Sequence, residues 1–574
     1  MEPVTTHLRN FPLSVLLLLF TPFLLFFLYS QFPPNLSHIP GSPLTQYTNL
    51  PRLLTTLRAR TPTTHISLHA KYGPIVRLGP QMVSISDPTA LQIIYSSDTT
   101  KPAFTKTPQF HGTAETATWY KGKPLPLLTA AQDVSYHARL VRASASAFKA
   151  GSNKTPEKKI KELVDQVLEK LNKQSHSPRD PSVIDEFAFD ATGIIVQGSS
   201  LGFVSTGKDV GFGWLALSVI YLYLSVVSQI SWVHKYLMGS KAVQMLIGGF
   251  SPILRFSVAS VEKVWKEAKI GDEGEDESFL HNIKRVNSGF KEPLTEEEII
   301  CLAFGSYVVA PLAVGITLRS ILYYLARNPS VYERLQREIN VELSGDEFTV
   351  AEARKLVYLD AVIMEALRMH PVLGFVLERV VPKGGTELSG KYLPEGTVVG
   401  INPWVLMRNK GIYGHDADEF RPERWLEATP EKLKEMKRYN LSFGAGIRAC
   451  KGKDIAMMEI LTFVPALMRR FDFRLQRPNW EWSVLGRFFT PQSGMDMKIH
   501  ALFNIPGQEP QFHDFCQYEV LDNGCAGIWS PGRATFRVLN NMELRMFVAN
   551  MKVDGGGHGQ QYHNVYGYFS CSSC

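Results

Sequence analysis

The chain has 574 residues, of which 45% are hydrophobic and 20% are charged. This composition is that of an ordinary globular protein, and it excludes a disordered, collagen-like or small disulfide-rich chain. Lys and Arg (61) exceed Asp and Glu (54) by only 7, and no Lys/Arg-rich block occurs, so nucleic acid is not indicated as a partner. Only Cys301 and Cys450 of the six cysteines precede residue 503, which suggests a reducing compartment for that part.

The first predicted element is an apolar helix over residues 11–32, which contain no charge and are mostly Leu and Phe. A helix of this size is about 33 Å long, enough to span the roughly 30 Å hydrocarbon core of a bilayer. We therefore predict a membrane anchor over residues 1–32. A cleaved signal peptide is the alternative, but the apolar run is too long and no small-residue cleavage site follows. The Pro-rich residues 33–50 then predict a stiff hinge.

A large globular domain, the predicted catalytic domain, covers residues 51–502, with strands near its start and helices through its middle. A second uncharged stretch, residues 211–233, is a rival membrane span, but its serines and glutamine favour amphipathic or buried helices. The remaining predicted elements are two short strands within 71–88 with turns at Gly73-Pro74 and Gly79-Pro80, helices over 157–171, 296–327 and 331–343 with a stop at Asn328-Pro329, and strands and turns over 379–403.

The tail over residues 503–574 differs from the body because it holds four of the six cysteines and a Gly-rich stretch. Cys571 and Cys574 have a local spacing suited to zinc, and Cys516, Cys525 and three histidines lie in the same tail. The spacing of Cys516 and Cys525 fits no zinc pattern, however. We therefore favour a loosely ordered extension, or an incorrectly assigned gene end, over a zinc site.

A glycine-containing loop over residues 443–452 brings one thiol, that of Cys450, to the start of a helix expected from about 453 to 471. The N-terminus of a helix offers unpaired N–H groups and the positive end of the helix dipole, and both stabilise a thiolate. Alone, Cys450 could equally be a buried structural cysteine, which is the usual role of a single cysteine.

The neighbours of this thiol suit a bound cofactor. Gly444 and Gly446 allow positive φ angles, and Gly452 has no side chain where a flat cofactor must approach closely. Arg448, two residues before the thiol, can reach a cofactor carboxylate. The loop therefore suits a flat cofactor that carries a carboxylate.

Two other segments contain charged residues that could pair with one another inside the protein. Glu365 and Arg368 are three residues apart and share one face of a predicted helix, although such a pair is common by chance. Arg424 follows within residues 420–425 (FRPERW). A buried network of Glu365, Arg368 and Arg424 would fix the thiol-bearing loop to the helical body, because buried charges need partners.

Together these segments resemble the cytochrome P-450 superfamily of heme-thiolate enzymes. Residues 443–452 match the family element F-x-x-G-x-R-x-C-x-G at every fixed position, Glu365 and Arg368 match E-x-x-R, and residues 422–424 match P-E-R. The resemblance covers about residues 35–502. In the local sequence of several segments, the chain looks most like fungal enzymes of the pisatin-demethylase-like group.

The resemblance implies a fold that is mainly α with a small β lobe, the helical prism of the family, together with an N-terminal transmembrane helix. Family members of this type are single-pass proteins of the endoplasmic reticulum membrane with a cytosolic catalytic domain, which agrees with residues 11–32. The implied cofactor is heme b, whose iron takes the thiolate of Cys450. Electrons would come from NADPH through a flavoprotein reductase, with Lys451 and Lys453 available to meet its acidic face.

Four residues are implied as partners of the heme carboxylates. Arg448 and Arg379 occupy positions where the family has such arginines, and His137 lies where it often has Trp or His. The family's usual Arg four residues after that position is Val141 here, and Arg142 is the adjacent candidate.

The long central helix departs from the family. Members usually have A/G-G-x-D/E-T there, where an acid and an alcohol help deliver protons during dioxygen activation, but this chain has Leu312 and Ala313 at those two positions. Pro311 lacks an N–H, so the carbonyl of Tyr307 loses its helical partner and we expect a kink. Protons could come from a substrate hydroxyl or ordered water, and Tyr307 and Thr317 are remote substitutes.

These features predict a monooxygenase that inserts one oxygen atom of O₂ into an apolar small molecule by hydroxylation, epoxidation or demethylation, in fungal secondary metabolism. The apolar character rests on residues 212–253, which are rich in Trp, Leu, Tyr and Val, and on the pocket-lining candidates Phe375, Val376 and Leu377. Because of Leu312 and Ala313, a heme-thiolate isomerase or dehydratase, or a heme-binding protein with little turnover, is the alternative.

Overall fold

The computed structural model describes residues 36–96, 102–115, 119–124, 127–148, 154–173, 182–211, 214–247, 252–267, 278–343, 345, 347–502, 550–553 and 561–564. Contacts divide the chain into two units, residues 1–504 and 505–574. In the second unit, β13 (Asn550–Val553) pairs with β14 (Gln561–Asn564) as an antiparallel hairpin. The predicted membrane anchor and the cysteines of the tail lie outside the described residues.

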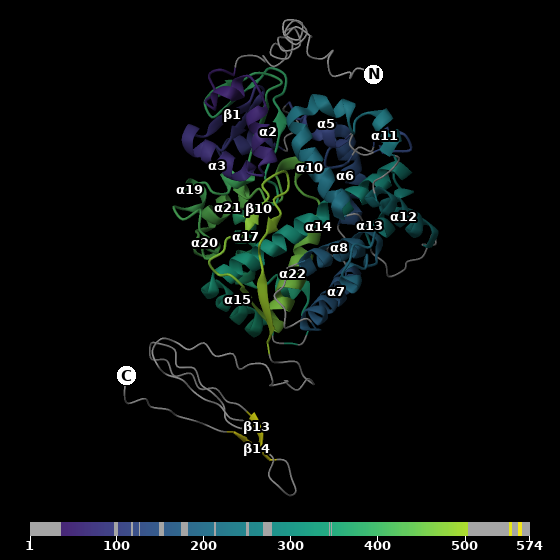
Figure 1. Cartoon of the computed structure of the whole chain (residues 1–574), viewed down its shortest axis with the longest axis vertical. Helices are drawn as coiled ribbons and strands as arrows, with labels where there is room; N and C mark the ends of the chain where they lie inside the picture. The colour runs from purple at the N-terminus through teal and green to yellow at the C-terminus, as the bar shows by residue number, and fades with distance from the viewer. Residues whose placement is uncertain are drawn as a thin grey trace, which may run out of the picture. The chain divides into compact units, whose positions relative to one another are not determined.

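The first half of the larger unit contains short strands near its start and then mostly helices (Figure 1). Its elements are η3 (Pro43–Gln46), α2 (Leu50–Leu57), α3 (Thr61–Tyr72), β1 (Ile75–Gly79), β2 (Met82–Ile85), α4 (Ala90–Ile94), α5 (Phe110–Glu115), β3 (Trp119–Tyr120), β4 (Lys123–Pro124), α6 (Val134–Phe148), α7 (Lys154–Lys173), α8 (Ser182–Gln197), α9 (Phe203–Thr206), α10 (Trp214–Val227), η5 (Ser228–Tyr236), α11 (Lys241–Ile247), α12 (Pro252–Glu267) and α13 (Phe279–Asn287).

The second half begins with the longest helix and returns to strands before and after the thiol-bearing loop. Its elements are α14 (Glu296–Arg327), α15 (Pro329–Glu342), α16 (Val350–Ala353), α17 (Val357–Met369), β5 (Arg379–Val380), β6 (Thr386–Leu388), β7 (Lys391–Leu393), β8 (Val398–Ile401), α18 (Pro403–Leu406), α19 (Lys410–Tyr413), α20 (Arg424–Glu427), α21 (Pro430–Tyr439), η6 (Gly446–Arg448), α22 (Lys453–Arg470), β9 (Phe471–Leu475), β10 (Ser483–Val484), β11 (Gln492–Ser493) and β12 (Met497–Ala501).

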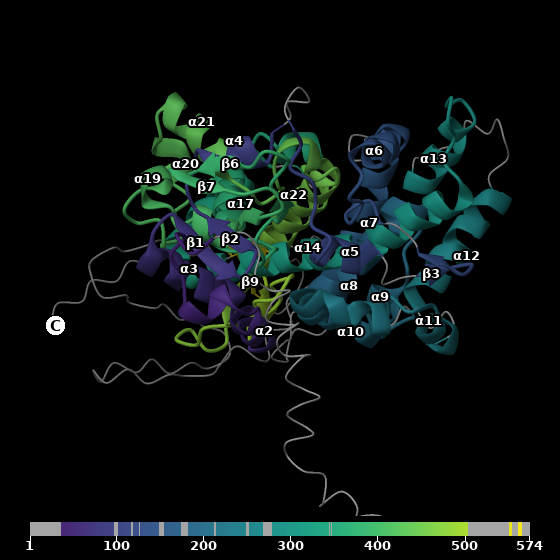
Figure 2. The same cartoon turned by 90° about the horizontal axis from the view of Figure 1, so that it is seen from above.

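The largest sheet has four strands in the order β1-β2-β8-β5. β1 and β2 form the hairpin predicted from the turn at Gly79-Pro80, and β8 joins β2 in parallel with Val83 opposite Val399. Every residue of β1 and β2 is buried, so both faces of this hairpin are covered. In Figure 2 the sheet lies on one side of the unit and α8 to α13 lie on the other.

The helix α14 runs between these two sides. A capping box of Thr295 and Glu298 begins it, and it ends before Asn328-Pro329, as the sequence predicts. The helix continues through Pro311, so the missing N–H of this proline does not end it. Its C-terminal half packs in one hydrophobic core with α7, α8, α15, α17 and α22, while its N-terminal half packs in a second core with α6, α10, α12 and α13.

The uncharged stretch predicted to be amphipathic or buried forms α10 and η5, with non-helical backbone angles at Ile230. Among the described residues, two helical segments are long and apolar enough to cross a membrane, residues 217–236 and α14. Of their most apolar windows, 39% and 67% respectively are buried. The first segment also hydrogen-bonds to the body, because the Ser225 hydroxyl accepts the N–H of Phe488. Its polar residues thus serve packing on the body.

Candidate active site

The loop before α22 holds the Cys450 thiol at a helix start, as predicted. The Cys450 N–H donates to the Phe443 carbonyl at 2.8 Å, and Gly452 is the residue that caps α22. Gly446 has a φ of 63°, and a Cβ there would lie 1.9 Å from the carbonyl oxygen of Tyr95. Glycine is therefore required both by the backbone angle and by the close approach of another chain segment.

The two described cysteines lie in opposite environments: Cys301 is buried, whereas Cys450 is exposed. The role of a buried structural cysteine therefore belongs to Cys301. Burial by the surrounding protein nevertheless raises the pKa of the Cys450 thiol, while the Gly452 N–H and two lysines act to lower it. A bound cation beside the accessible Cys450 thiol would favour its thiolate form.

Arg448 is the strongest indication of a bound anion near this thiol. Both terminal nitrogens of its guanidinium are buried and have no hydrogen-bond partner among the described residues. Burial, and next the charge of Arg379, lower the pKa of Arg448 to about 10, and Asp133 acts in the opposite direction with less effect. A buried guanidinium without a partner is costly, so an anionic group at this position would stabilise the site.

Other basic groups act on the same region. Arg379 is buried, donates from Nη1 to the Glu378 carbonyl at 2.7 Å, and lies over the ring of Tyr95. Lys106, whose ammonium donates to the Thr129 carbonyl, has a pKa well below its usual value, first because of burial and then because of Arg448 and Arg379. Lys106 has no sequence motif around it, and so sequence reasoning missed it.

The two candidates on α6 differ in their surroundings. His137 is buried, and burial, followed by the charges of Arg448 and Lys106, lowers its pKa to about 3. Arg142 on the same helix is exposed. The structure thus brings His137 together with the cations around Arg448, whereas Arg142 faces outward.

One face of α14 borders accessible space although most of the helix is buried. The partly exposed residues recur at a spacing of about four, which places them on one face. A Cβ added at Gly305 would have only the Leu127 side chain within 4 Å, at 3.9 Å. The residues of this face are Gly305, Ser306, Val309, Ala310, Leu312 and Ala313.

The hydroxyls considered as substitutes on α14 are held by protein. Tyr307 donates to the Ser260 hydroxyl at 3.2 Å, and Thr317 donates to the Ala313 carbonyl at 2.8 Å. A different hydroxyl, that of Tyr221 on α10, donates to the Val308 carbonyl at 2.5 Å, one turn before Leu312. Tyr221 lies in the apolar stretch, whose composition alone does not indicate this contact.

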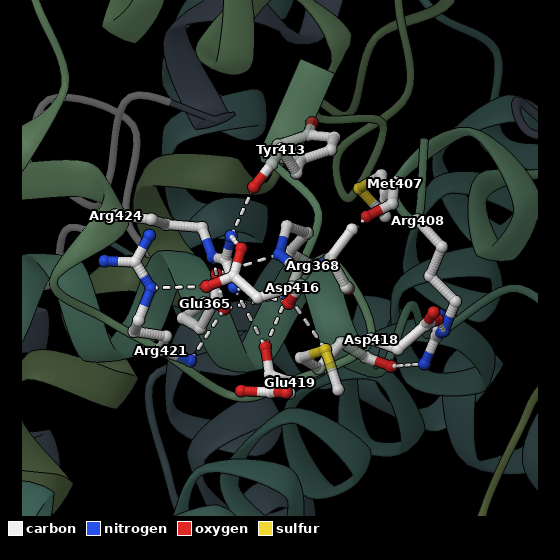
Figure 3. A network of polar contacts seen from close by, with 12 residues as sticks. Glu365, Arg368, Met407, Arg408, Tyr413, Asp416, Asp418, Glu419, Arg421 and Arg424 are labelled. Atoms are coloured by element: carbon white, nitrogen blue, oxygen red, sulfur yellow. Dashed lines mark hydrogen bonds and ion pairs between the residues drawn. The ribbon is translucent and has the colours of Figure 1, made fainter. Parts of the chain in front are cut away.

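Glu365 contacts both arginines of the predicted network, as Figure 3 shows. Arg368 donates to its two carboxylate oxygens from Nε and Nη2, each at 2.8 Å, and Arg424 donates from Nε at 2.8 Å. The side chains of Glu365 and Arg368 are 0% exposed. Burial acts to raise the pKa of Glu365, but hydrogen bonding and charge, first from Arg368, lower it.

This network fixes the segments that precede the thiol-bearing loop. Arg368 also donates to the carbonyls of Met407 and Ala417, and Arg424 pairs with Asp416 (Figure 3). Ser442, at the start of the loop, donates to the Leu367 carbonyl on α17 at 3.2 Å. α17 therefore holds both the charged segment and the loop. Asp416, which the sequence motifs do not contain, completes the pairing.

A family model described as Cytochrome P450 matches residues 40–499. The chain belongs to the cytochrome P450 family. Among its relatives, a cytochrome P450 monooxygenase of Aspergillus terreus is 34% identical over 76% of this chain and 90% of its own. A cytochrome P450 monooxygenase of Penicillium aethiopicum is 33% identical over 82% and 95%, and a pisatin demethylase of Fusarium vanettenii is 29% identical over 80% and 88%.

Membership of this family makes the chain a cytochrome P450 monooxygenase, an oxidoreductase, and the family implies a heme iron with a thiolate ligand. The residues present fit that group. Heme b has two carboxylates, and Arg448 offers two buried nitrogens without partners beside Arg379, Lys106 and His137.

Proposed function

We propose that this P450 binds heme b through the Cys450 thiolate and inserts one oxygen atom of O₂ into an apolar small molecule. The reaction class is hydroxylation, epoxidation or demethylation, in fungal secondary metabolism, with electrons from NADPH through a flavoprotein reductase. The observation that carries the proposal is the buried, unpartnered guanidinium of Arg448 two residues before an accessible thiol. The relationship to fungal monooxygenases, among them a pisatin demethylase, supports the reaction class.

The chain's own residues position and protect the cofactor. Bound heme supplies O₂ activation, which a thiolate ligand favours by its electron donation. The Phe443 carbonyl and Gly446 hold the loop that presents Cys450, while Arg448 and Arg379 hold the carboxylate side. Lys106 and His137 add donors at the same edge.

Proton supply differs from that of most relatives in this proposal. Leu312 and Ala313 carry no group that exchanges protons, and the hydroxyls of Tyr307 and Thr317 already donate to protein oxygens. We infer that protons reach the site through a substrate hydroxyl or ordered water. The same two residues favour the second candidate function, a heme-thiolate isomerase or dehydratase, because such chemistry requires no proton delivery to dioxygen.

We also propose attachment to the endoplasmic reticulum membrane by a single span, with the catalytic domain in the cytosol. Support comes from exposed apolar side chains on neighbouring elements, since α2 contacts both α10 and η5. Such a surface suits contact with lipid and with apolar substrates. Its members and their exposed fractions are Leu44 58%, Leu50 47%, Leu57 48%, Trp232 51% and Tyr236 63%.

Absorption spectra of the reduced, carbon monoxide-bound protein test the thiolate. We expect the thiolate-type Soret band in the wild type and in the control Cys301→Ser, and its loss in Cys450→Ser. NADPH consumption with a purified flavoprotein reductase then separates the two functions, since monooxygenation requires both NADPH and O₂, whereas isomerisation or dehydration requires neither. An imidazole-type or neutral-thiol spectrum in folded wild-type protein would contradict the proposal.

A further inference from the structure

A cavity of about 230 Å³ lies among α2, α3, β1 and residues 375–378. Among the described residues it shares none with the thiol-bearing loop, the cations around Arg448 or α14. One part of its wall is apolar and the other carries polar side chains. Its lining residues of interest are Leu68, Leu78, Met82, Phe375 and Val376 on the apolar part and Arg52, Thr61, His65, Arg77 and Glu378 on the polar part.

The charged groups of the lining are paired within the protein. Arg52 donates to Glu378 at 3.2 Å, and the second carboxylate oxygen of Glu378 accepts from Thr107 at 2.8 Å. Arg77 donates to the Gly79 and Pro80 carbonyls. Because each charge already has partners, the cavity does not call for a charged ligand.

Within the described chain, His65 instead has a free ring N–H, and its contacts with Asn402 determine which of the two ring nitrogens carries the proton. The Asn402 amide nitrogen donates to His65 Nδ1 at 2.9 Å and also to the Gly374 carbonyl, while the Asn402 amide oxygen accepts the N–H of Trp404. The amide orientation is thus assigned by three contacts, so Nδ1 is an acceptor and the ring proton is on Nε2. Burial lowers the pKa of His65 to about 3, which keeps the ring neutral.

Two polar groups in this wall therefore have hydrogen-bonding capacity that protein does not use. No described residue accepts from His65 Nε2, and the buried hydroxyl of Thr61 has no partner within the described chain. Thr61 and His65 are four residues apart on α3 and so lie on the same face of that helix. Buried polar groups are normally satisfied, and both residues line the same cavity, which favours a ligand that accepts hydrogen bonds.

We propose that this cavity is a second ligand site, which binds a small uncharged molecule with an apolar body and one carbonyl or ether oxygen. The oxygen accepts from His65 Nε2–H and Thr61, and the body packs against Met82, Leu78 and Phe375. None of the residues that line this cavity is among those assigned to the thiolate or to the heme carboxylates, although Phe375 and Val376 were also candidates for lining the substrate pocket. The hydrogen bonds of His65 and Thr61 do not involve heme.

A matched pair of probes tests the site in the full-length holoenzyme. 2-Acetylnaphthalene carries a carbonyl oxygen where 2-isopropenylnaphthalene has a methylene group of similar shape. Equilibrium dialysis measures total binding, while heme absorbance reports binding near the iron. We expect a class of binding without change in the heme spectrum, about two- to tenfold tighter for the ketone, which is the gain from about one net hydrogen bond.

Variants then locate that binding. His65→Phe and Thr61→Val should each remove most of the preference for the ketone, while Thr63→Val, an exposed neighbour on α3, should leave it unchanged. Thr61→Val keeps the shape of the wall and removes an unpartnered hydroxyl, so it provides the answer if His65→Phe does not fold. Equal affinity for both probes, or a ketone preference that survives Thr61→Val in folded protein, would overturn the proposal. Because dialysis requires no turnover, this result is separate from the monooxygenase tests.

Discussion

Glu459 on α22 is a buried acid whose Oε2 has no hydrogen-bond partner in the described chain, and its residue is 1% exposed. Burial raises its pKa from the usual 4.5 to about 8. The folded protein therefore keeps Glu459 protonated at pH values where the unfolded chain has lost the proton. Folded stability consequently falls as the pH rises from about 4.5 to about 8, and this contribution is constant above that range.

Replacing Glu459 by Met removes both the titration and the unpartnered oxygen. We expect the free energy of unfolding of Glu459→Met to exceed that of the wild type by an amount that grows with pH, by about 4 kcal/mol between pH 4.5 and pH 8. Urea unfolding at several pH values measures the difference. Glu342→Met, at an exposed position, is the control, and a stability difference independent of pH would contradict the expectation.

Individual site residues differ in how far sequence could predict them. Cys450 and Arg448 lie in a family motif, from which their roles could be predicted; in the structure the Cys450 thiol is exposed and the terminal nitrogens of Arg448 are buried without a partner among the described residues. Lys106 and Asp416 reach their positions only through tertiary folding, because nothing in the neighbouring sequence marks them. Tyr221 was indistinguishable from other residues of an apolar helix until its contact with Val308 was known.

At the scale of elements, the network around Glu365 joins α17 to the segment before the thiol-bearing loop. Glu365→Gln leaves two buried arginines without their shared carboxylate, and we expect a loss of about 3–5 kcal/mol in the free energy of unfolding. Chemical denaturation of the variant checks the loss. Glu333→Gln on α15, at an exposed position, should change stability by less than about 0.5 kcal/mol. A similarly small loss at Glu365 would show that the network contributes little.

The accessible face of α14 offers a test of proton supply. Leu312→Asp combined with Ala313→Thr places an acid and an alcohol on this face, and we expect a several-fold higher fraction of NADPH electrons recovered in product. Product and NADPH are measured together during turnover. Leu312→Asn with Ala313→Val has similar size without the acid or hydroxyl and is the control. An unchanged ratio in the first variant would show that proton supply is already sufficient.

Boundaries of elements were predictable where local chemistry sets them. The Asn328-Pro329 stop and the turn at Gly79-Pro80 act within a few residues, and the structure has both. Pro311 removes one N–H from α14, yet the helix is continuous through it, and both of its halves pack in hydrophobic cores. The kink expected at Pro311 stays a prediction.

At the scale of the whole molecule, the exposed apolar surface predicts contact with lipid. Trp232 is 51% exposed on η5 beside other apolar side chains. In vesicles of brominated phosphatidylcholine we expect tryptophan fluorescence of the full-length protein to be quenched, with the quenched part reduced in Trp232→Phe. Trp480→Phe, at a site 54% exposed outside this surface, is the control. Equal quenching in all three proteins would place Trp232 in water.

α14 belongs to two hydrophobic cores at once, with Ile299 to Val308 in one and Val314 to Leu325 in the other. Unfolding of α14 would therefore disrupt the packing of both cores, and loss of packing in either core would remove contacts that hold α14 in place. Thermal denaturation of the catalytic unit should accordingly be a single cooperative transition rather than two successive ones. A destabilising substitution at either end of α14 should lower the stability of both cores.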